Sequence, residues 1–311
     1  MLRELEKRIM SIDNELQNIE GNNLSPAQLL MKKQLERNKN ELLEALSNNL
    51  TPADRVSLAR HPMRPGTREY ISHLFTDFFI QKGDRLCKED ESILGGLAFY
   101  KGQPVTVIGQ CKGKNLEENI KYNFGMPGPE GYRKVIRLAK QAEKFSRPII
   151  TFIDTPGAYP GLEAEERGQG EAIARCLSTF CDLEVPVIAI VIGEGGSGGA
   201  LALGVANTII MLENSIFSVL SPEGFASILW KNVSRSDEAC EIMKLTAGDL
   251  YDFKIIDHIV KEPAGGAHRD PEDVFGKIDN LLYKEICRLS SLSRSELADE
   301  RYKKFREMGN V

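Results

Sequence analysis

Hydrophobic positions near the start of the chain recur every three or four residues, whereas those further along form short continuous runs. The first set consists of Leu2, Leu5, Ile9, Ile12, Leu16 and Ile19. This spacing predicts one amphipathic helix with a narrow apolar seam. Residues 21–23 (Gly-Asn-Asn) interrupt it, and Ser25 caps a second helix in which Gln28 completes a capping box. We therefore expect a helical hairpin over residues 1–50, and we interpret it as an assembly arm.

The middle of the chain alternates short apolar runs with helical patterns. Residues 94–100 and 104–109 predict a β-hairpin that turns at Lys101-Gly102. Later strands are expected at Ile149, Val187 and Ile209, and over residues 215–220, each followed by a helix or turn. Such alternation is typical of an α/β domain with a parallel sheet, here placed at residues 51–290. A charged helix over about 295–308 would form a solvated or interfacial tail, residues 291–311.

The segment 185–206 (VPVIAIVIGEGGSGGALALGVA) combines a buried strand, a glycine-rich loop and an Ala/Leu-rich helix. Such a unit directs several backbone N–H groups at one point, with the positive end of the helix behind them. Glycine is needed there because a Cβ would block the close approach of a ligand. The loop is therefore predicted to hold an anion or an oxyanion.

Taken alone, the glycine loop is compatible with three kinds of site. Gly193, Gly195 and Gly198 match a dinucleotide-binding fingerprint, with Glu213 after the next strand as the ribose acid. A plain oxyanion hole made of backbone amides is the second possibility.

A serine hydrolase is the third possibility. Ser197 lies in a GxSxG pattern between strand and helix, as in a nucleophile elbow. Acids and histidines follow in the order that a hydrolase triad would require, namely Asp249, Asp252, Asp257, His258 and His268.

A second loop of the same kind precedes the first. Residues 148–161 (PIITFIDTPGAYPG) form a buried strand that runs into glycines and prolines, and about 38 residues separate the two strands, the length of one parallel repeat. Adjacent parallel strands place their carboxyl-terminal loops side by side. Gly157 and Ala158 should thus face the amides of residues 195–199 across a shared cleft. A two-sided amide hole suits the chemistry of enolates and thioesters.

Composition excludes several other functions. The net charge of −5 argues against nucleic acid as the main partner, and no apolar run approaches the roughly 20 residues of a membrane span. The six cysteines show no CxxC pair and no metal-ligand spacing, which fits reduced thiols and no metal on this chain. The charged, helical start (MLRELEKRIM) does not look like a signal peptide, so we expect a cytoplasmic protein.

Seven strings give the chain a specific resemblance. They are RHPMRP, NFGMPGPEGYRK, PIITFIDTPGAYPG, AEERGQGEAIAR, GEGGSGGALA, SPEGFASILWK and GGAHRDPE, in this order over about residues 60–272. Together they resemble the alpha subunits of the bacterial acetyl-coenzyme A carboxylase carboxyltransferase family. The resemblance implies a crotonase-like spiral of ββα repeats. It also implies transfer of a carboxyl group from carboxybiotin to acetyl-coenzyme A, which gives malonyl-coenzyme A for fatty-acid synthesis.

The same resemblance assigns roles to the glycine loops. The amides of Gly198 and Gly199 would hold the ureido oxygen of biotin. The other substrate-binding residues would be Gly195 and Gly196 in the turn, Gly157 and Ala158 on the opposite wall, and Glu223 and Gly224 facing the cleft. The biotin would be attached to a separate carrier protein that a biotin carboxylase charges. A beta subunit with a zinc ribbon would complete an α2β2 enzyme and hold most of the coenzyme A.

No residue near the loops has the character of a general base. His61, His73, His258 and His268 lie far from them in sequence, and we interpret all four as structural. The resemblance implies that the ureido group of biotin takes the proton, which leaves Ser197 as a turn residue. A basic stripe on one helix is interpreted as a solvated face, with contact to coenzyme A or to a partner as the alternative; its members are Arg133, Arg137, Lys140 and Lys144.

Overall fold

The computed structural model describes residues 2–19, 25–48 and 50–309 of the 311-residue chain. Its centre is an eight-stranded sheet in the order β1-β2-β3-β4-β5-β6-β8, with β7 paired to the end of β5. The strands are β1 (Thr76–Ile80), β2 (Ile93–Tyr100), β3 (Gln103–Gln110), β4 (Ile149–Thr155), β5 (Val187–Gly196), β6 (Thr208–Leu212), β7 (Ile216–Ser218) and β8 (His258–Val260). Strands β1 to β3 are antiparallel, and the pairs from β3 onward are parallel.

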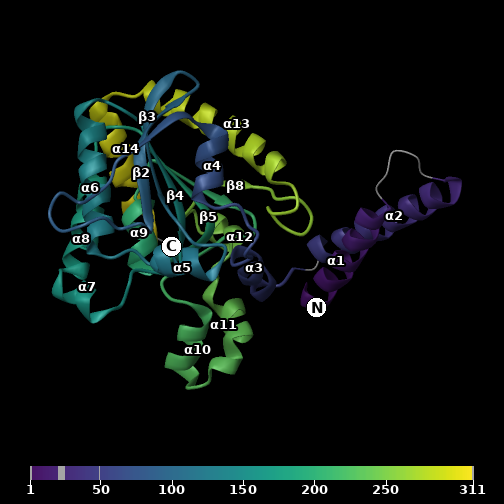
Figure 1. Ribbon diagram of the computed structural model, residues 1–311. Coiled ribbons are helices and arrows are strands. Elements are labelled where there is room, and N and C mark those ends of the chain that lie inside the picture. The colour runs from purple at the N-terminus through teal and green to yellow at the C-terminus, as the bar shows by residue number, and fades with distance from the viewer. Residues whose placement is uncertain (1, 20–24, 49, 310–311) are drawn as a thin grey trace.

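Helices cover both faces of the sheet (Figure 1). One face packs against α6 (Pro129–Lys144), α8 (Gln169–Asp182) and α9 (Ser197–Gly204), and the other against α4 (Thr67–Leu74) and α13 (Pro271–Ser290). Every residue of β4 is buried, because a parallel sheet between two helical layers is apolar on both sides. The predicted parallel α/β core is therefore confirmed.

The remaining helices lie at the edges and ends of this sandwich. They are α3 (Pro52–Ala59), α5 (Leu116–Lys121), α7 (Leu162–Glu166), α10 (Pro222–Trp230), α11 (Ser236–Met243), α12 (Ala247–Asp252) and α14 (Arg294–Glu307), with short 3-10 turns at Asn123–Gly125 and Val233–Arg235. Helices α10 and α11 pack on each other and protrude below the body in Figure 1. None of the helices in the described ranges has both the length and the apolar character needed to cross a membrane.

The predicted hairpin of β2 and β3 is confirmed, with Tyr100 paired to Gln103 across a two-residue turn. Lys101 and Gly102 both have positive φ, +47° and +83°. Two successive left-handed residues are the requirement of a type I′ turn, whose twist matches that of the strands.

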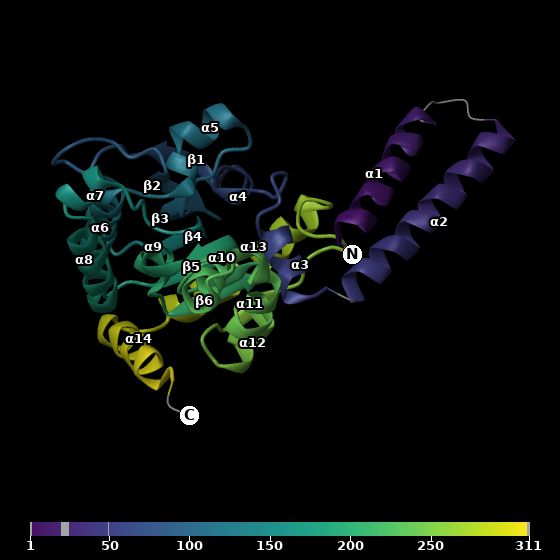
Figure 2. The ribbon, with the colours of Figure 1, turned by 90° about the horizontal axis from the view of Figure 1, so that it is seen from below.

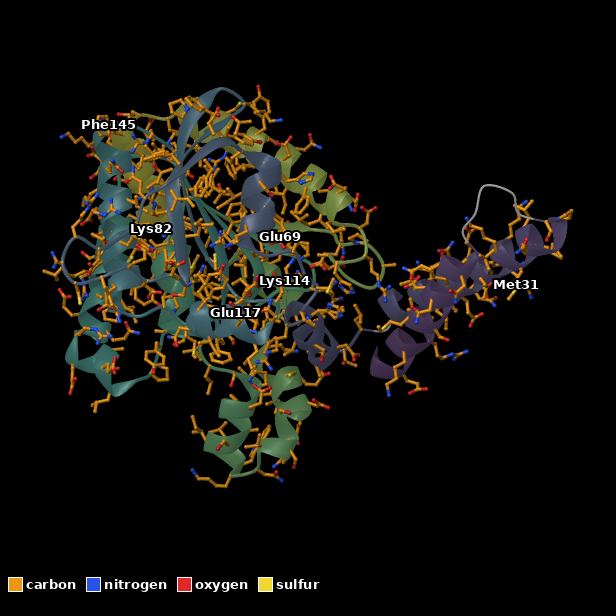
Figure 3. The ribbon with its side chains drawn as sticks, viewed as in Figure 1. Met31, Glu69, Lys82, Lys114, Glu117 and Phe145 are labelled. Atoms are coloured by element: carbon orange, nitrogen blue, oxygen red, sulfur yellow. The ribbon has the colours of Figure 1, made fainter. Side chains whose placement is uncertain are left out.

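Helices α1 (Leu2–Asn18) and α2 (Pro26–Asn48) run beside each other and project from the body (Figures 1 and 2). Ile9 is fully buried against Leu58 of α3, and Asp13 pairs with Arg269 at 2.8 Å. The capping box of Ser25 and Gln28 is confirmed, whereas the predicted break at 21–23 lies outside the described residues. Met31, labelled in Figure 3, is half exposed near the outer end of the arm.

Helix α14 differs from the solvated or interfacial tail that its charge suggested. Arg301 is only 1% exposed and donates hydrogen bonds to the carbonyls of Phe180, Leu183 and Val185 and to the side chain of Asn207. The inner face of the helix is thus part of the protein interior. The count of charges along the helix could not show this, because the acceptors come from segments about 100 residues away.

Replacing Arg301 by methionine should destabilise the protein strongly. The carbonyl oxygens that it now satisfies would stay buried without a donor, so we expect a loss of about 3 kcal/mol in the free energy of unfolding. Urea unfolding of Arg301→Met, compared with Lys303→Met on the exposed side of the same helix, measures the difference. Equal and small losses in both variants would contradict the buried role of Arg301.

Candidate functional site

The two glycine loops meet where neighbouring strands end. Strands β4 and β5 pair in parallel from Ile149 with Val187 up to Thr155 with Gly195. A Cβ built on Gly196 would lie 2.1 Å from the carbonyl oxygen of Pro156, and one on Gly199 would lie 2.5 Å from the nitrogen of Ala158. The structure therefore brings the loop after β4 into direct contact with the loop after β5, as the strand order led us to expect.

The backbone amides of the two loops differ in whether their N–H groups already donate a hydrogen bond within the protein. Gly198 and Gly199 are in the first turn of α9, where N–H groups have no acceptor four residues back within the helix. Gly157, with φ +149°, donates its N–H to the Thr155 hydroxyl at 3.1 Å. Among the described residues, none accepts a hydrogen bond from the Ala158 N–H. Ala158, rather than Gly157, is thus the free donor on the wall opposite Gly199.

The glycines of the second loop are required for different reasons. A Cβ on Gly195 would lie 2.6 Å from the Phe217 ring, so Gly195, like Gly196 and Gly199, is imposed by packing. A Cβ on Gly198 would meet only the Ile173 side chain, at an ordinary 3.5 Å. A Cβ on Gly198 therefore has room in the fold, unlike one on Gly195, Gly196 or Gly199.

Two buried side chains that the sequence did not single out support these loops. Gln110, at the end of β3, donates to the carbonyl of Gly199 at 2.8 Å and accepts from the N–H of Asp154 at 3.2 Å. The Tyr132 hydroxyl lies 2.9 Å from the position that a Cβ on Gly199 would take, and it has no partner among the described residues. Burial raises the pKa of Tyr132 well above its usual value, so the hydroxyl stays a neutral donor.

An alternating series of charges lies beside the loops. Lys112 contacts Asp154 at 2.8 Å and Glu194 at 2.6 Å, and Arg60 joins Glu194 at 2.5 Å to Glu223 at 2.6 Å. Burial opposes the charge of Glu194, but Lys112 and Arg60 outweigh it, so the pKa of Glu194 is lowered. Burial likewise opposes the charge of Lys112, yet Asp154 and Glu194 raise its pKa. The charged forms of Lys112, Glu194, Arg60 and Glu223 are thus stabilised by their ion-pair partners.

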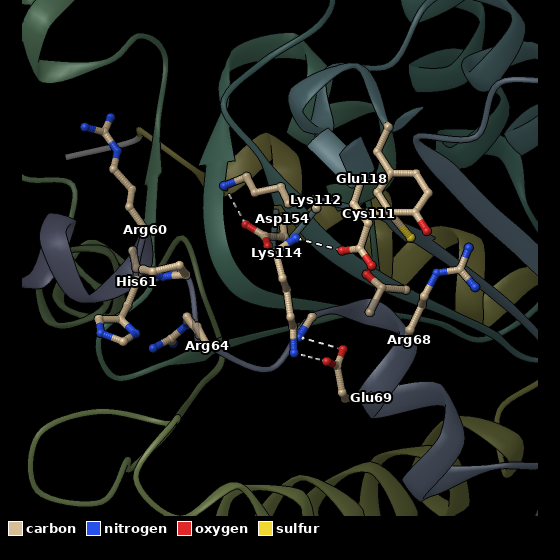
Figure 4. A pocket seen from close by; sticks show the side chains of 16 residues that line it. Arg60, His61, Arg64, Arg68, Glu69, Cys111, Lys112, Lys114, Glu118 and Asp154 are labelled. Atoms are coloured by element: carbon tan, nitrogen blue, oxygen red, sulfur yellow. Dashed lines mark hydrogen bonds and ion pairs between the residues drawn. The ribbon is translucent and has the colours of Figure 1, made fainter. Parts of the chain in front are cut away.

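A cavity of about 160 Å³ adjoins this charge series (Figure 4). Arg60, His61, Lys112 and Asp154 are among its lining residues, and none of the predicted glycines of the two loops is. Figure 4 shows the contact of Lys112 with Asp154, and Lys114 beside Glu69 and Glu118. The cavity is therefore separate from the amide-lined site.

Glu223 and Gly224, which were expected to face the cleft, make contacts at the start of α10. Glu223 is linked to the β5 strand through Arg60, which also binds Glu194. The N–H of Gly224 donates to Ser221, the N-cap of α10. Glu223 thus anchors α10, and the amide of Gly224 is used in a helix cap.

The residues needed by a serine hydrolase are not assembled. Ser197 is exposed with φ +54° at the strand–helix junction, which resembles a nucleophile elbow. Among the described residues, however, none hydrogen-bonds to its hydroxyl. His268 stacks on His61 with ring centroids 3.8 Å apart, and His258 pairs with Glu285 at 3.3 Å. No base is therefore supplied to Ser197 by the part of the chain that the structure describes.

Glu213, the acid that the dinucleotide-binding pattern requires, is engaged elsewhere in the fold. Glu213 binds Lys261 at 2.7 Å and accepts the N–H of Glu262, so it ties β6 to the segment after β8.

The basic stripe on α6 is mostly engaged in the fold. Arg133 binds Asp84 at 2.9 Å, and Arg137 donates to the carbonyl of Gly83 at 3.1 Å. Lys140 pairs with Glu143 on its own helix. The stripe therefore fastens the segment between β1 and β2 instead of forming a fully solvated face.

Comparison with known proteins identifies close relatives of the chain. A family model described as acetyl co-enzyme A carboxylase carboxyltransferase-like matches residues 2–309. The chain is 57% identical over 277 residues to an acetyl-coenzyme A carboxylase carboxyl transferase subunit alpha from Geobacillus thermodenitrificans, covering 89% of this chain and 85% of that protein. The subunit of the same name from Oceanobacillus iheyensis is 56% identical over 88% of this chain and 87% of its own length.

Solved structures share the fold at much lower identity. The beta subunit of Pseudomonas aeruginosa geranyl-CoA carboxylase is 17% identical with a TM-score of 0.58, over 78% of this chain and 46% of that one. A Pseudomonas malonate decarboxylase hetero-tetramer in complex with coenzyme A gives 15% and 0.56, over 68% and 84%. Transcarboxylase 12S gives 16% and 0.55, and this chain spans 42% of its length. The fold is therefore the crotonase-like fold of carboxyltransferases.

The stacked histidines beside the cavity should make the protein sensitive to acid. Burial, together with the charges of His61, Arg269 and Arg64, lowers the pKa of His268 from 6.5 to about 3. Between these two values the unfolded chain takes up a proton that the folded chain does not, so stability falls as the pH drops below 6.5.

We expect His268→Phe to flatten this decline because phenylalanine keeps the stacking but cannot be protonated. Urea unfolding of the variant and the parent chain at several pH values from 7 to 4.5 measures the two slopes. Parallel slopes would show that His268 does not carry the acid sensitivity.

Proposed function

We propose that the chain, which belongs to the acetyl-coenzyme A carboxylase carboxyltransferase family, takes part in carboxyl transfer from carboxybiotin to acetyl-coenzyme A. The relatives that it matches are alpha subunits. The product would be malonyl-coenzyme A. The observation that carries the proposal is the contact between two amide-bearing loops at the ends of β4 and β5. Such a site stabilises an oxyanion and needs no nucleophilic side chain.

The reaction develops negative charge on two oxygens, and each needs donors that are already in place. One is the thioester oxygen when the methyl group loses a proton, and the other is the ureido oxygen of biotin. A single preorganised donor is typically worth about 10²–10³ in rate. We assign the N–H groups of Gly198 and Gly199 to the ureido oxygen, with Ala158 on the opposite wall.

Bound biotin supplies both the carboxyl group and the base that takes the methyl proton. The role of this chain is then to bind and orient the ureido oxygen with amides that do not titrate. Gly195 and Gly196 keep the turn tight, and Gln110 holds the first turn of α9 against β4. The fit rests on the first turn of α9 and on the N–H of Ala158, which has no acceptor in the described part of the chain.

The proposal includes partners outside this chain. A beta subunit with a zinc ribbon would hold acetyl-coenzyme A and complete an α2β2 enzyme, with biotin on a carrier protein that an ATP-dependent biotin carboxylase charges. The cytoplasm is the expected compartment.

We further propose residues 1–50 as an assembly arm, residues 51–290 as the carboxyltransferase domain and residues 291–311 as a helical tail whose inner face packs on that domain through Arg301. Exposed apolar side chains on the arm, Met10, Leu30 and Met31, support a contact with another subunit.

The reverse reaction tests this function directly. Decarboxylation of malonyl-coenzyme A in the presence of biocytin is measured with the chain alone, with a family beta subunit alone, and with both. We expect turnover only in the mixture, since the two oxyanions would be held by different subunits. Turnover by this chain alone would refute the division of the site, and a mixture without turnover would refute carboxyl transfer.

Three substitutions in one loop separate backbone from side-chain catalysis. Ser197→Ala should keep most activity, because the hydroxyl has no role in the proposed site. Gly198→Val should keep the fold, where a Cβ has room, but lose about 10²-fold in kcat as its side chain blocks the ligand. Gly199→Ala should lose both stability and activity, because its Cβ would collide with Ala158.

Steady-state kinetics of the mixed enzyme and thermal melting of each variant provide the measurements. A fluorophosphonate probe is the control for the hydrolase alternative. Labelling at Ser197, or equal and severe losses in Ser197→Ala and Gly198→Val, would overturn the proposed mechanism.

A further inference from the structure

The strand ends that precede the two amide loops are linked by the charged side chain of Lys112, which belongs to neither loop. Asp154 is the penultimate residue of β4 and Glu194 lies near the end of β5, so each carboxylate directly precedes one loop. Lys112, in the segment after β3, contacts both carboxylates, Asp154 at 2.8 Å and Glu194 at 2.6 Å. The backbone N–H of Glu194 also donates to Asp154 at 3.0 Å. The ends of both strands are thus bridged by one ammonium group.

The bridge is largely shielded from solvent. The side chains of Asp154 and Glu194 are 12% and 10% exposed, and that of Lys112 is 23% exposed. Gly193 leaves the space in which Asp154 lies, since a Cβ there would be 2.4 Å from the carboxylate oxygen. Partly buried charges interact more strongly than exposed ones, and removing Lys112 would take from Asp154 its ion-pair partner. Arg60 extends the series from Glu194 to Glu223 on α10.

We infer that Lys112 is a positioning residue for carboxyl transfer, which fixes the separation of the Ala158 amide from the Gly198 and Gly199 amides by holding Asp154 and Glu194 together. The inference rests on the proposed function, because the same amides are the oxyanion donors. Without Lys112 the two carboxylates would face each other and repel, and the strand ends that carry the loops would separate. A misplacement of about 1 Å at a reacting centre can cost roughly 10²-fold in rate.

The alternative is that the ion pairs only add stability to the folded chain. A structural role alone lowers the amount of active enzyme and leaves kcat per folded molecule and KM unchanged. A positioning role lowers kcat per folded molecule, with little change in the KM for malonyl-coenzyme A, because the ground-state binding of that substrate does not depend on the distance between the loops.

The experiment compares variants in the mixed enzyme, by biocytin-dependent decarboxylation of malonyl-coenzyme A corrected for folded protein. Lys112→Met should lower kcat about 10-fold or more at nearly constant KM. Lys112→Arg keeps a cation that can reach both carboxylates and should recover part of kcat. Lys304→Met is the matched control, since Lys304 is a shielded cation paired with Asp257 at the other end of the sheet. It should lose stability with kcat unchanged.

A second variant keeps the inference testable if Lys112→Met does not fold. Gly193→Ala removes no charge but pushes Asp154 away from Lys112, so it should also lower kcat. Unchanged kcat per folded molecule in Lys112→Met or Gly193→Ala, or equal losses of kcat in Lys112→Met and Lys304→Met, would overturn the positioning role. Activity of the unmodified mixture distinguishes this outcome from failure of the proposed function, which would abolish turnover in every sample.

Discussion

The close approach of the two loops at the ends of β4 and β5 is the constraint on which the candidate site depends. Gly196 and Gly199 touch the backbone of residues 156–158 so closely that neither has room for a Cβ. This contact requires the parallel pairing of β4 with β5 and the irregular register between Ile153 and Thr155 that precedes the loops. In the proposed site, main-chain amides of the two loops can act together only because the glycines let two stretches of backbone meet.

When backbone amides carry the chemistry, the work of side chains is to hold them in place. Gln110 links the first turn of α9 to β4, Tyr132 packs against Gly199, and Lys112 joins the two strand ends. This division is also consistent with solved structures only 15–17% identical to the chain sharing its fold. The geometry of the backbone can be kept while most side chains change.

Local sequence patterns were sufficient to predict the helices, the strands and the two glycine loops. The glycines after β5, the strand before Asp154 and the turn at Lys101-Gly102 follow from short-range sterics and from periodicity, and the structure contains all three. The meeting of the two loops also followed, because adjacent parallel strands end at the same edge of a sheet. The resemblance of seven strings pointed to the family, which the relatives at 56–57% identity confirm.

The sequence by itself therefore determined the strands, the caps, the two glycine loops and the family. Only the tertiary structure decided which amide stays free, since Gly157 donates its N–H to Thr155 while the N–H of Ala158 finds no acceptor within residues 2–19, 25–48 and 50–309. The same holds for Glu223, which pairs with Arg60, and for Arg301, which is buried within a charged helix. The physical reason is that hydrogen bonds and ion pairs depend on partners that are distant in sequence, whereas turns, caps and periodicity depend on neighbours.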